Sequence, residues 1–192
     1  MEIARQLREN NVCEYLLYMW QVEDTIRALG LDIERIRTEY LSGFQFTPDQ
    51  ERKELEWFEN LVRMMREEGC TERGHLQVIR GTLALLVDLH RQLLQSPKHP
   101  FYSAAYYRAL PYIVELRARN GNHADGAESD NETTLPVEEI ETCLNCLYGV
   151  MLLRLQKKDV SKETQTAVTA ISRLLAMLSD AWKKEKQGTL AI

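Results

Sequence analysis

The residues of this chain that could do chemistry are few, and its cysteines are the first to consider. Cys143 and Cys146 form a Cys-x-x-Cys pair, a spacing found in thiol–disulfide exchange and in half of a structural zinc site. The pair lies two turns inside a helix expected to begin near Pro136, whereas redox pairs gain their low thiol pKa at a helix N-terminus. Cys13 and Cys70 are too scattered to complete a zinc site. We therefore interpret the pair as buried thiols, and we predict no cofactor and no bound metal.

Carboxylate spacings give two further tests for a metal site. Glu72 and His75 match Glu-x-x-His, but di-iron helical bundles need that motif twice and the chain has one copy. Pairs such as Glu51/Glu54 are typical of helical nucleotide pyrophosphatases, but the downstream Glu-x-x-Asp of those enzymes is missing. A Gly-rich phosphate loop, a nucleophile elbow and His-Glu-x-x-His are missing as well. These absences favour a non-enzymatic role.

His90 occupies a position in an apolar stripe whose other members are aliphatic. A buried histidine needs a hydrogen-bond partner, and the candidates are Glu23 and a tyrosine hydroxyl such as that of Tyr15. The favoured interpretation is a hydrogen-bonded core histidine, and the alternative is a ligand-binding or proton-transferring histidine.

Aromatic and charged residues on the first long helix suggest a ligand-binding cluster. Glu23 and Arg27 form an i, i+4 pair, and Trp20 lies beside them on the same helix. In a central cavity these side chains could hold an organic ligand, with an arginine engaging an anion. The same residue types at helical spacing also make an ordinary core, which is the competing interpretation. The candidate ligand-binding residues are Tyr15, Trp20, Glu23, Arg27, His90 and Tyr106.

The elements that would position these residues are predicted to be helices throughout. Apolar residues recur at steps of three and four in segment after segment, beginning with residues 12–29. The stretch Thr47-Pro48-Asp49-Gln50 is typical of a helix start, with a capping threonine, a proline at the first position and a glutamine three residues on. No stretch alternates with period two, so no sheet is expected. The predicted helices are 12–29, 32–41, 47–69, 71–95, 101–119, a sixth from Pro136 and a seventh from Ser161, preceded by a helical turn or two at 2–8.

These helices predict an all-α fold, namely a seven-helix up-down bundle with mainly antiparallel neighbours. Alternating steps of three and four favour near-parallel packing, and short connections make successive helices antiparallel. We expect residues 1–192 to form a single helical domain, with a flexible exposed loop at 120–134. Pro111 predicts either a kink or two short helices that meet at Leu110.

Composition and charge restrict the partners of the chain. Its net charge is −5, which argues against a general nucleic-acid binder and against anionic membrane surfaces. No apolar run has the length of a signal peptide core or a membrane span. We therefore predict a cytoplasmic protein with neither nucleic acid nor membrane among its partners.

Four long stretches resemble a known family: EYLLYMWQVEDTIRA at 14–28, WFENLVRMMREEG followed by GHLQ within 57–77, SPKHPFYSAAYYRALPYIVELRAR at 96–119 and ETCLNCLYGVMLLRLQKK at 141–158. The chain resembles a family of small helical proteins from Bacteroides-type bacteria that is known only as a domain of unknown function. The resemblance implies a bacterial protein with an all-helical fold, and it implies no activity, cofactor or site residue.

The first functional hypothesis is a non-enzymatic interaction or regulatory module, expected to be a homodimer or to bind another protein. Its expected contact surface is aromatic and consists of Trp20, Trp57, Phe101, Tyr102, Tyr106 and Tyr107. The alternative is a small-molecule-binding or enzymatic bundle whose polar cluster contains Tyr15, Glu23, Arg27 and His90.

Overall fold

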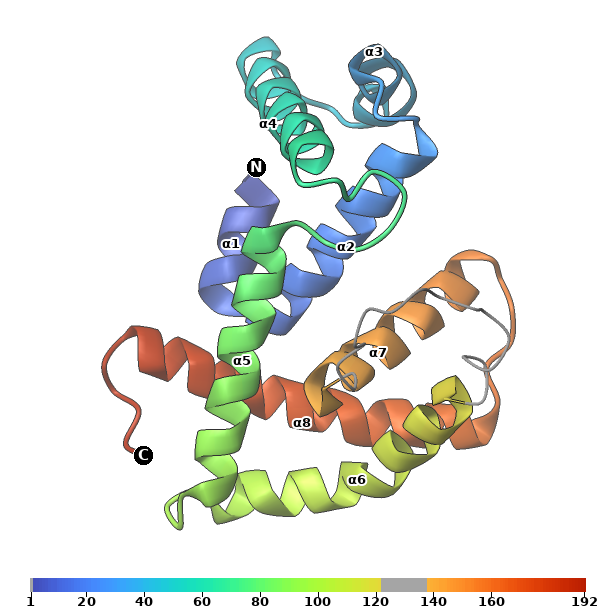
Figure 1. The fold of residues 1–192 in the computed structure, drawn as a ribbon. Helices are drawn as coiled ribbons and strands as arrows, with labels where there is room; N and C mark the ends of the chain where they lie inside the picture. Colours follow the sequence, from blue (N-terminus) through green and yellow to red (C-terminus); the bar gives the residue numbers. More distant parts are fainter. Residues whose placement is uncertain (1, 122–137) are drawn as a thin grey trace. The chain divides into compact units, whose positions relative to one another are not determined.

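A computed structural model describes residues 2–121 and 138–192, and within these residues the chain is built from helices alone (Figure 1). The all-α prediction is thus confirmed there, and no strand occurs. Eight α-helices are present in the described residues, so the predicted number of seven is wrong. The elements are α1 (Glu2–Asn10), α2 (Val12–Ala28), α3 (Ile33–Arg35), a π-helical turn η1 (Ile36–Tyr40), a 3-10 turn η2 (Leu41–Gly43), α4 (Pro48–Glu67), α5 (Gln77–Gln95), α6 (Pro100–Gly121), α7 (Glu139–Leu155) and α8 (Lys162–Lys186).

The extra helix is α1, where only a turn or two was predicted. The Glu2 carboxylate in its first turn accepts hydrogen bonds from Arg5 at 2.8 Å and from Gln6 at 2.9 Å. Such contacts at spacings of three and four support a helix whose only buried side chain is Ala4. The up-down order of the predicted bundle stays a prediction.

The helix predicted at 32–41 is regular only at its start. Asp32 caps α3 as expected, accepting from the Glu34 N–H at 2.9 Å, but the chain then changes to the π-helical turn η1. The Leu41 N–H bonds to the Ile36 carbonyl, which stacks these two residues, and their side chains are the fully buried ones of the segment. An α-helix does not place residues five apart on one face, whereas a π-turn does.

Helix starts follow the capping residues that the sequence offers. Asn11 accepts from the Glu14 N–H at 3.2 Å and Ser161 accepts from the Thr164 N–H at 3.2 Å. Thr47 and Gln50 form the predicted reciprocal capping box. These caps satisfy N–H groups that the first turn of a helix leaves without a partner.

The predicted helix at 71–95 begins six residues later than expected, at Gln77. Gly74 has φ +81°, a left-handed conformation that interrupts a helix and that glycine adopts without strain. Residues 70–76 therefore form an irregular connection from α4 to α5, and Glu72 and His75 do not share a helix face.

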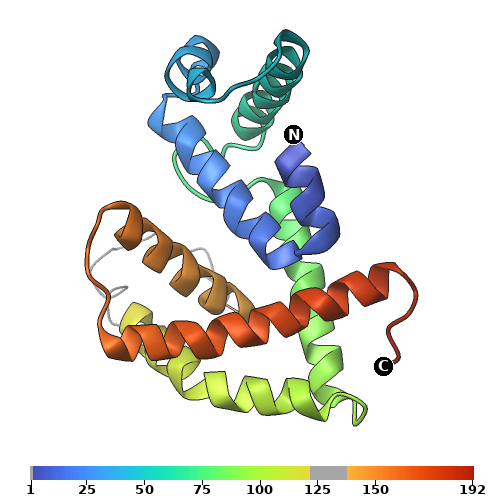
Figure 2. The same cartoon turned by 180° about the vertical axis from the view of Figure 1, so that it is seen from behind.

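The chain divides into two compact units, residues 1–83 and 84–192. Unit 1 contains α1 to α4 and the first part of α5, with a core that includes Leu16, Ile26, Phe58 and Met65. Unit 2 contains the rest of α5 with α6, α7 and α8, which lie together in both ribbon views (Figures 1 and 2). Its core includes Leu93, Ile113, Leu144, Ile171 and Leu178. The single-domain organisation stays a prediction.

Helix α6 is continuous through Pro111, so the two-helix alternative for this segment is wrong. Both ribbon views show the helix changing direction along its length, as a proline inside a helix requires (Figures 1 and 2). The predicted loop at 120–134 lies outside the described residues, except that residues 120–121 end α6. Helix α7 begins at Glu139, and Pro136 likewise lies outside the described residues.

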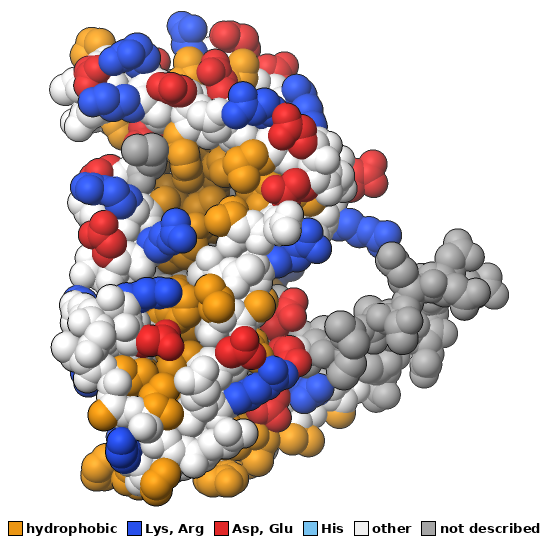
Figure 3. Space-filling view, turned by 60° about the vertical axis from the view of Figure 1, so that its left-hand side comes forward, with side chains coloured by type: hydrophobic (Ala, Val, Ile, Leu, Met, Phe, Trp, Pro, Cys, Tyr) orange, Lys and Arg blue, Asp and Glu red, His pale blue; other side chains and the backbone are white. Residues whose placement is uncertain are grey.

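The surface carries both signs of charge. On the face drawn in Figure 3, acidic and basic side chains are intermixed, and apolar side chains reach the surface between them. None of the described helices is both long enough and apolar enough to cross a membrane.

Candidate functional site

Glu23, one of the predicted site residues, is a carboxylate with no exposed surface. The imidazole Nδ1–H of His75 donates to its Oε2 at 2.5 Å, and the Leu76 N–H donates to its Oε1 at 2.8 Å. Both donors come from the irregular connection that precedes α5. Both carboxylate oxygens of Glu23 therefore accept hydrogen bonds from the protein itself.

Arg27, one turn further along α2, binds the same connection. Its Nη2 donates to the carbonyl oxygens of Cys70, at 3.2 Å, and of Gly74. Its Nη1 donates to Asp24 on its own helix at 2.8 Å. Arginine offers a planar fork of donors, which suits this bridging of two carbonyls on a turn.

The aromatic neighbours of this network are buried as well. Trp20 is 2% exposed, and its ring stacks on His75 with centroids 4.7 Å apart and planes at 17°. Tyr15 is buried nearer the start of α2, and burial raises the pKa of its phenol. Trp20, Glu23 and Arg27 therefore hold residues 70–76 against α2, which is a structural role. The buried Arg27 Nε–H has no hydrogen-bond partner among the described residues.

His90 lies in unit 2 and has different partners from those expected. Its Nδ1 and the Tyr102 hydroxyl are 2.6 Å apart, and its Nε2 lies 3.7 Å from a carboxylate oxygen of Glu139. Because Nε2 faces a carboxylate, it carries the proton, and the Tyr102 hydroxyl donates to Nδ1. The partner of His90 is thus a tyrosine hydroxyl as expected, but it belongs to Tyr102, so the pairing with Tyr15 or with Glu23 is wrong.

This pairing follows from the short turn between α5 and α6. Ser96 and Pro97 end α5, and α6 begins at Pro100, so the last turns of α5 face the first turns of α6. The first turn of α7 then adds Glu139, which also lies 3.9 Å from Arg117 on α6.

Tyr106, another predicted residue, completes the cluster. Its ring meets that of His90 edge-on, with centroids 5.3 Å apart. Burial, followed by its hydrogen bond to the negatively charged Glu139, raises the pKa of Tyr106 to about 12. Burial also lowers the pKa of His90, because the charged imidazolium loses its hydration. The cluster is therefore a neutral histidine between two protonated phenols.

The predicted ligand-binding residues thus fall into two groups within separate units. Tyr15, Trp20, Glu23 and Arg27 belong to unit 1, and His90 and Tyr106 belong to unit 2. Sequence reasoning missed the partners His75, Tyr102 and Glu139. Helical spacing gives no signal for these partners, because it does not show which turns of the chain meet.

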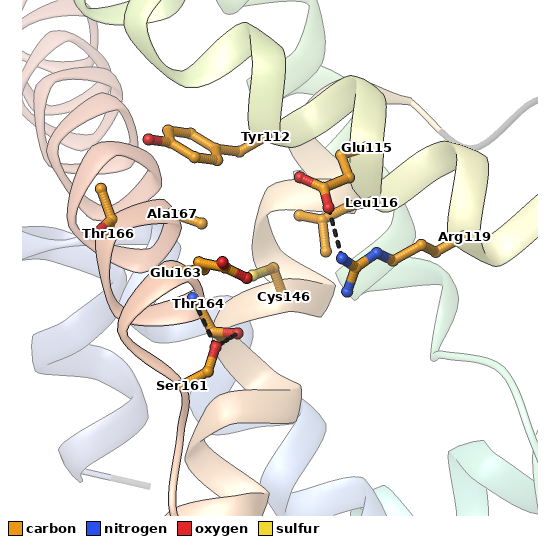
Figure 4. A pocket seen from close by; sticks show the side chains of 10 residues that line it. All are labelled: Tyr112, Glu115, Leu116, Arg119, Cys146, Ser161, Glu163, Thr164, Thr166 and Ala167. Atoms are coloured by element: carbon orange, nitrogen blue, oxygen red, sulfur yellow. Dashed lines mark hydrogen bonds and ion pairs between the residues drawn. The ribbon is translucent and has the colours of Figure 1, made fainter.

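A pocket of about 460 Å³ lies between α6, α7 and α8 (Figure 4), and no motif in the sequence indicates it. Its charged pair Glu115 and Arg119 is closed at 2.5 Å, and Ser161 contacts Thr164 at 3.0 Å. Cys146 also lines it, but burial raises the pKa of this thiol, which disfavours the nucleophilic thiolate. The described residues contain no group of three or more His, Cys, Asp or Glu side chains placed to hold a metal ion.

The most unusual surface is on α6, which carries two apolar stripes. One faces the core and includes Tyr102, Ala105, Ala109 and Ile113, which are at most 5% exposed. The other steps by three and four along the solvent side and consists of Ala104, Tyr107, Pro111, Val114 and Ala118. We call it the outer stripe. Tyr107 is 66% exposed and Val114 is 58% exposed.

The outer stripe differs from the aromatic surface predicted from the sequence. Trp20 and Tyr102 are buried, and Trp57 and Tyr106 are half-buried, so that surface does not exist as a whole. Phe101 and Tyr107 are exposed as predicted. Both stripes of α6 are apolar, so the sequence pattern did not show that one of them faces solvent.

Comparisons with known proteins point to one family. The chain matches a family over residues 1–189, which is nearly its full length. No curated protein and no solved structure matches it. The chain therefore belongs to the family described as a domain of unknown function, DUF4924.

Proposed function

We propose that the chain is a non-enzymatic interaction module that works as a homodimer, with two copies joined along the outer stripe of α6. The observation that carries the proposal is the spacing of the stripe, three, four, three, four, on the exposed side of the helix. This is the pattern by which two helices pack side by side with apolar knobs in the seam. Exposed apolar rows of this kind mark interaction surfaces rather than ordinary solvated helix faces.

Charge supports a second copy as the occupant of the stripe. Arg108 and Glu115 each follow a stripe residue and lie on the same flank, seven residues or roughly 10 Å apart along the helix. A two-fold interface brings each residue of one copy opposite its counterpart in a self-complementary way. If the helices pair antiparallel, Arg108 faces Glu115 of the partner subunit, and the reverse contact forms by symmetry. Glu115 already forms an ion pair with Arg119 on its own helix, and this ion pair holds the Glu115 side chain in place on that flank.

The polar clusters support the same proposal. Glu23 and Arg27 are engaged with residues 70–76, and His90 is engaged with Tyr102 and lies near Glu139. A binding role at the surface therefore fits the described residues better than a catalytic or small-molecule role inside the helices.

Sedimentation velocity over a wide range of protein concentration tests the proposal. We expect the wild-type chain to dimerise and the double variant Tyr107→Glu/Val114→Glu to stay monomeric, because it buries charge in the seam. The matched control is Phe101→Glu/Leu155→Glu, which changes two apolar side chains that are exposed but do not belong to the stripe, and it should still dimerise. A monomeric wild type, or a stripe variant that dimerises as well as the control, would overturn the proposal.

A charge swap tests the pairing within the same experiment. Arg108→Glu and Glu115→Arg should each weaken dimerisation, and the double swap should restore it, because opposite charges again face each other. Additive weakening in the double swap would exclude the antiparallel pairing of these two residues.

A further inference from the structure

A groove lies between α6 and α8 within unit 2. Its volume is about 700 Å³, and eight residues line it: Ala105, Arg108, Lys162, Gln165, Thr166, Thr169, Ala170 and Arg173. Small side chains explain the hollow, since alanine and threonine leave the space between two packed helices unfilled. The groove therefore results from the small side chains at the contact between α6 and α8.

The charge of the groove is opposite to that of the chain. Three of its lining residues are cations and none is a carboxylate, whereas the whole chain has 29 acidic and 24 basic residues. Arg108, Lys162 and Arg173 make no ion pair with any other described residue, whereas Arg117 and Arg119 of α6 lie 3.9 Å and 2.5 Å from carboxylates. The groove therefore offers positive charge that the described protein leaves uncompensated.

The other polar groups of the groove are already engaged. The hydroxyls of Thr166 and Thr169 donate to carbonyls of their own helix at 2.9 Å, and the Gln165 amide donates to the Val160 carbonyl at 2.8 Å. The N–H groups of the three cations are the donors that remain for a ligand. Lysine and arginine side chains have no hydrogen-bond acceptor, so the ligand must supply acceptor oxygens. Negatively charged oxygens bind them most strongly.

The spacing of the cations indicates an extended ligand. Lys162 and Arg173 lie on one stripe of α8, eleven residues or roughly 16 Å apart, and Arg108 faces them from α6. A compact phosphate needs donors that converge on one point, which cations at this separation do not provide. Single-stranded nucleic acid needs aromatic platforms for its bases, and the lining has none.

We propose that this groove binds an acidic, extended peptide segment of a partner protein. An extended strand advances about 3.3 Å per residue, so about five residues span the distance between the two cations of α8. Side-chain carboxylates at both ends of such a segment would pair with Lys162 and Arg173. The occupant is a second protein rather than a second copy, and Lys162 and Arg173 belong to α8, outside the outer stripe. Arg108 also flanks the outer stripe, so the end contacts with Lys162 and Arg173 carry the binding.

Isothermal titration calorimetry with a hexaglutamate peptide at low salt tests this proposal. We expect binding to the wild-type chain that weakens as salt is raised. In the double variant Lys162→Glu/Arg173→Glu the affinity should fall by about tenfold or more, because both end contacts become repulsive. The neutral variant Lys162→Gln/Arg173→Gln gives the same test with a smaller change, and circular dichroism verifies that both variants are folded.

The matched control reverses two exposed cations elsewhere in unit 2, Arg154→Glu/Lys158→Glu, which changes the net charge equally. It should keep wild-type affinity within about twofold. Equal weakening in both double variants would mean diffuse attraction and would overturn the proposal. Absence of binding to the wild type would overturn it too, and so would tighter binding of pyrophosphate or of oligo-thymidine than of hexaglutamate.

Discussion

Glu23 is a charged residue that the protein buries completely and then satisfies with two donors from one short segment. A carboxylate removed from water is costly unless hydrogen bonds replace its hydration. His75 and the Leu76 N–H provide those bonds, and the stacked Trp20 ring shields them from solvent. The stability of unit 1 therefore depends on this one side chain more than on exposed ion pairs.

Replacing Glu23 by alanine should lower the free energy of unfolding by about 2–4 kcal/mol, because two buried donors lose their acceptor. Urea denaturation followed by circular dichroism measures the loss. The control is Glu14→Ala, which removes an exposed carboxylate from the same helix and should cost less than about 1 kcal/mol. Equal losses in the two variants would show that the Glu23 contacts contribute little.

His90 should make the stability of the protein depend on pH. Burial lowers the pKa of His90 in the folded protein, so below about pH 6.5 the unfolded chain binds the proton first. This contribution to stability is complete above that pH and is lost as the pH falls toward the folded-state pKa. Its slope is at most about 1.4 kcal/mol per pH unit.

The variant His90→Leu separates this effect from other titrating groups. Near pH 7.5 it should be less stable than the wild type by about 1–3 kcal/mol, since the buried Tyr102 hydroxyl loses its acceptor. Toward pH 5.5 the difference should shrink, because leucine takes up no proton. Thermal unfolding at the two pH values measures it, and an unchanged difference would contradict the assigned role of burial.

At this scale the sequence indicated the right residues and the wrong partners. Glu23 and His90 stood out because each is polar at a buried helical position. Their partners His75, Tyr102 and Glu139 come from other segments of the chain, and helical spacing carries no information about which turns meet. A buried polar residue can therefore be predicted from pattern, whereas its hydrogen bond requires the tertiary fold.

At the scale of elements, caps and apolar spacing fixed most helix starts and ends. The capping box at Thr47 and the cap at Asn11 occur as predicted. The predicted helices were wrong where the backbone departs from the regular α-helix that apolar spacing indicates. This occurs at Gly74 before α5 and in the π-turn that buries Ile36 with Leu41. In each case a tertiary contact determined the backbone, and periodicity could not reveal it.

The two glycines near the start of α5 should respond oppositely to alanine. Gly74 has φ +81°, so Gly74→Ala should cost about 1 kcal/mol or more through backbone strain. Gly81 lies inside α5 with open space around an added Cβ, so Gly81→Ala should add about 0.4–1 kcal/mol. Urea denaturation of the two variants side by side measures both changes, and a shared sign would contradict the interpretation.

At the scale of the whole molecule, the sequence predicted the fold class but not its organisation. Helices account for every regular element of the described residues, as composition and periodicity indicated. The division at residues 83–84 falls inside α5, two residues after Gly81, and the helix continues through it. Compactness is a property of contacts between helices, so one continuous helix can belong to two units.

The function proposed for the molecule also depends on features visible only in three dimensions. Both apolar stripes of α6 step by three and four residues in the sequence, and only the fold shows that the outer stripe is exposed. The cationic groove likewise joins Arg108 to Lys162 and Arg173 from a helix more than fifty residues later.

The burial of Glu23 has a consequence for how the protein is made. Its two donors, His75 and Leu76, follow it by 52 and 53 residues, so they are synthesised long after α2. During translation α2 can form as a helix, but packing it fully before that point would leave a carboxylate in an apolar core without a partner. Unit 1 therefore completes its core only after residue 76 has left the ribosome. In a shorter nascent chain α2 is not fully packed.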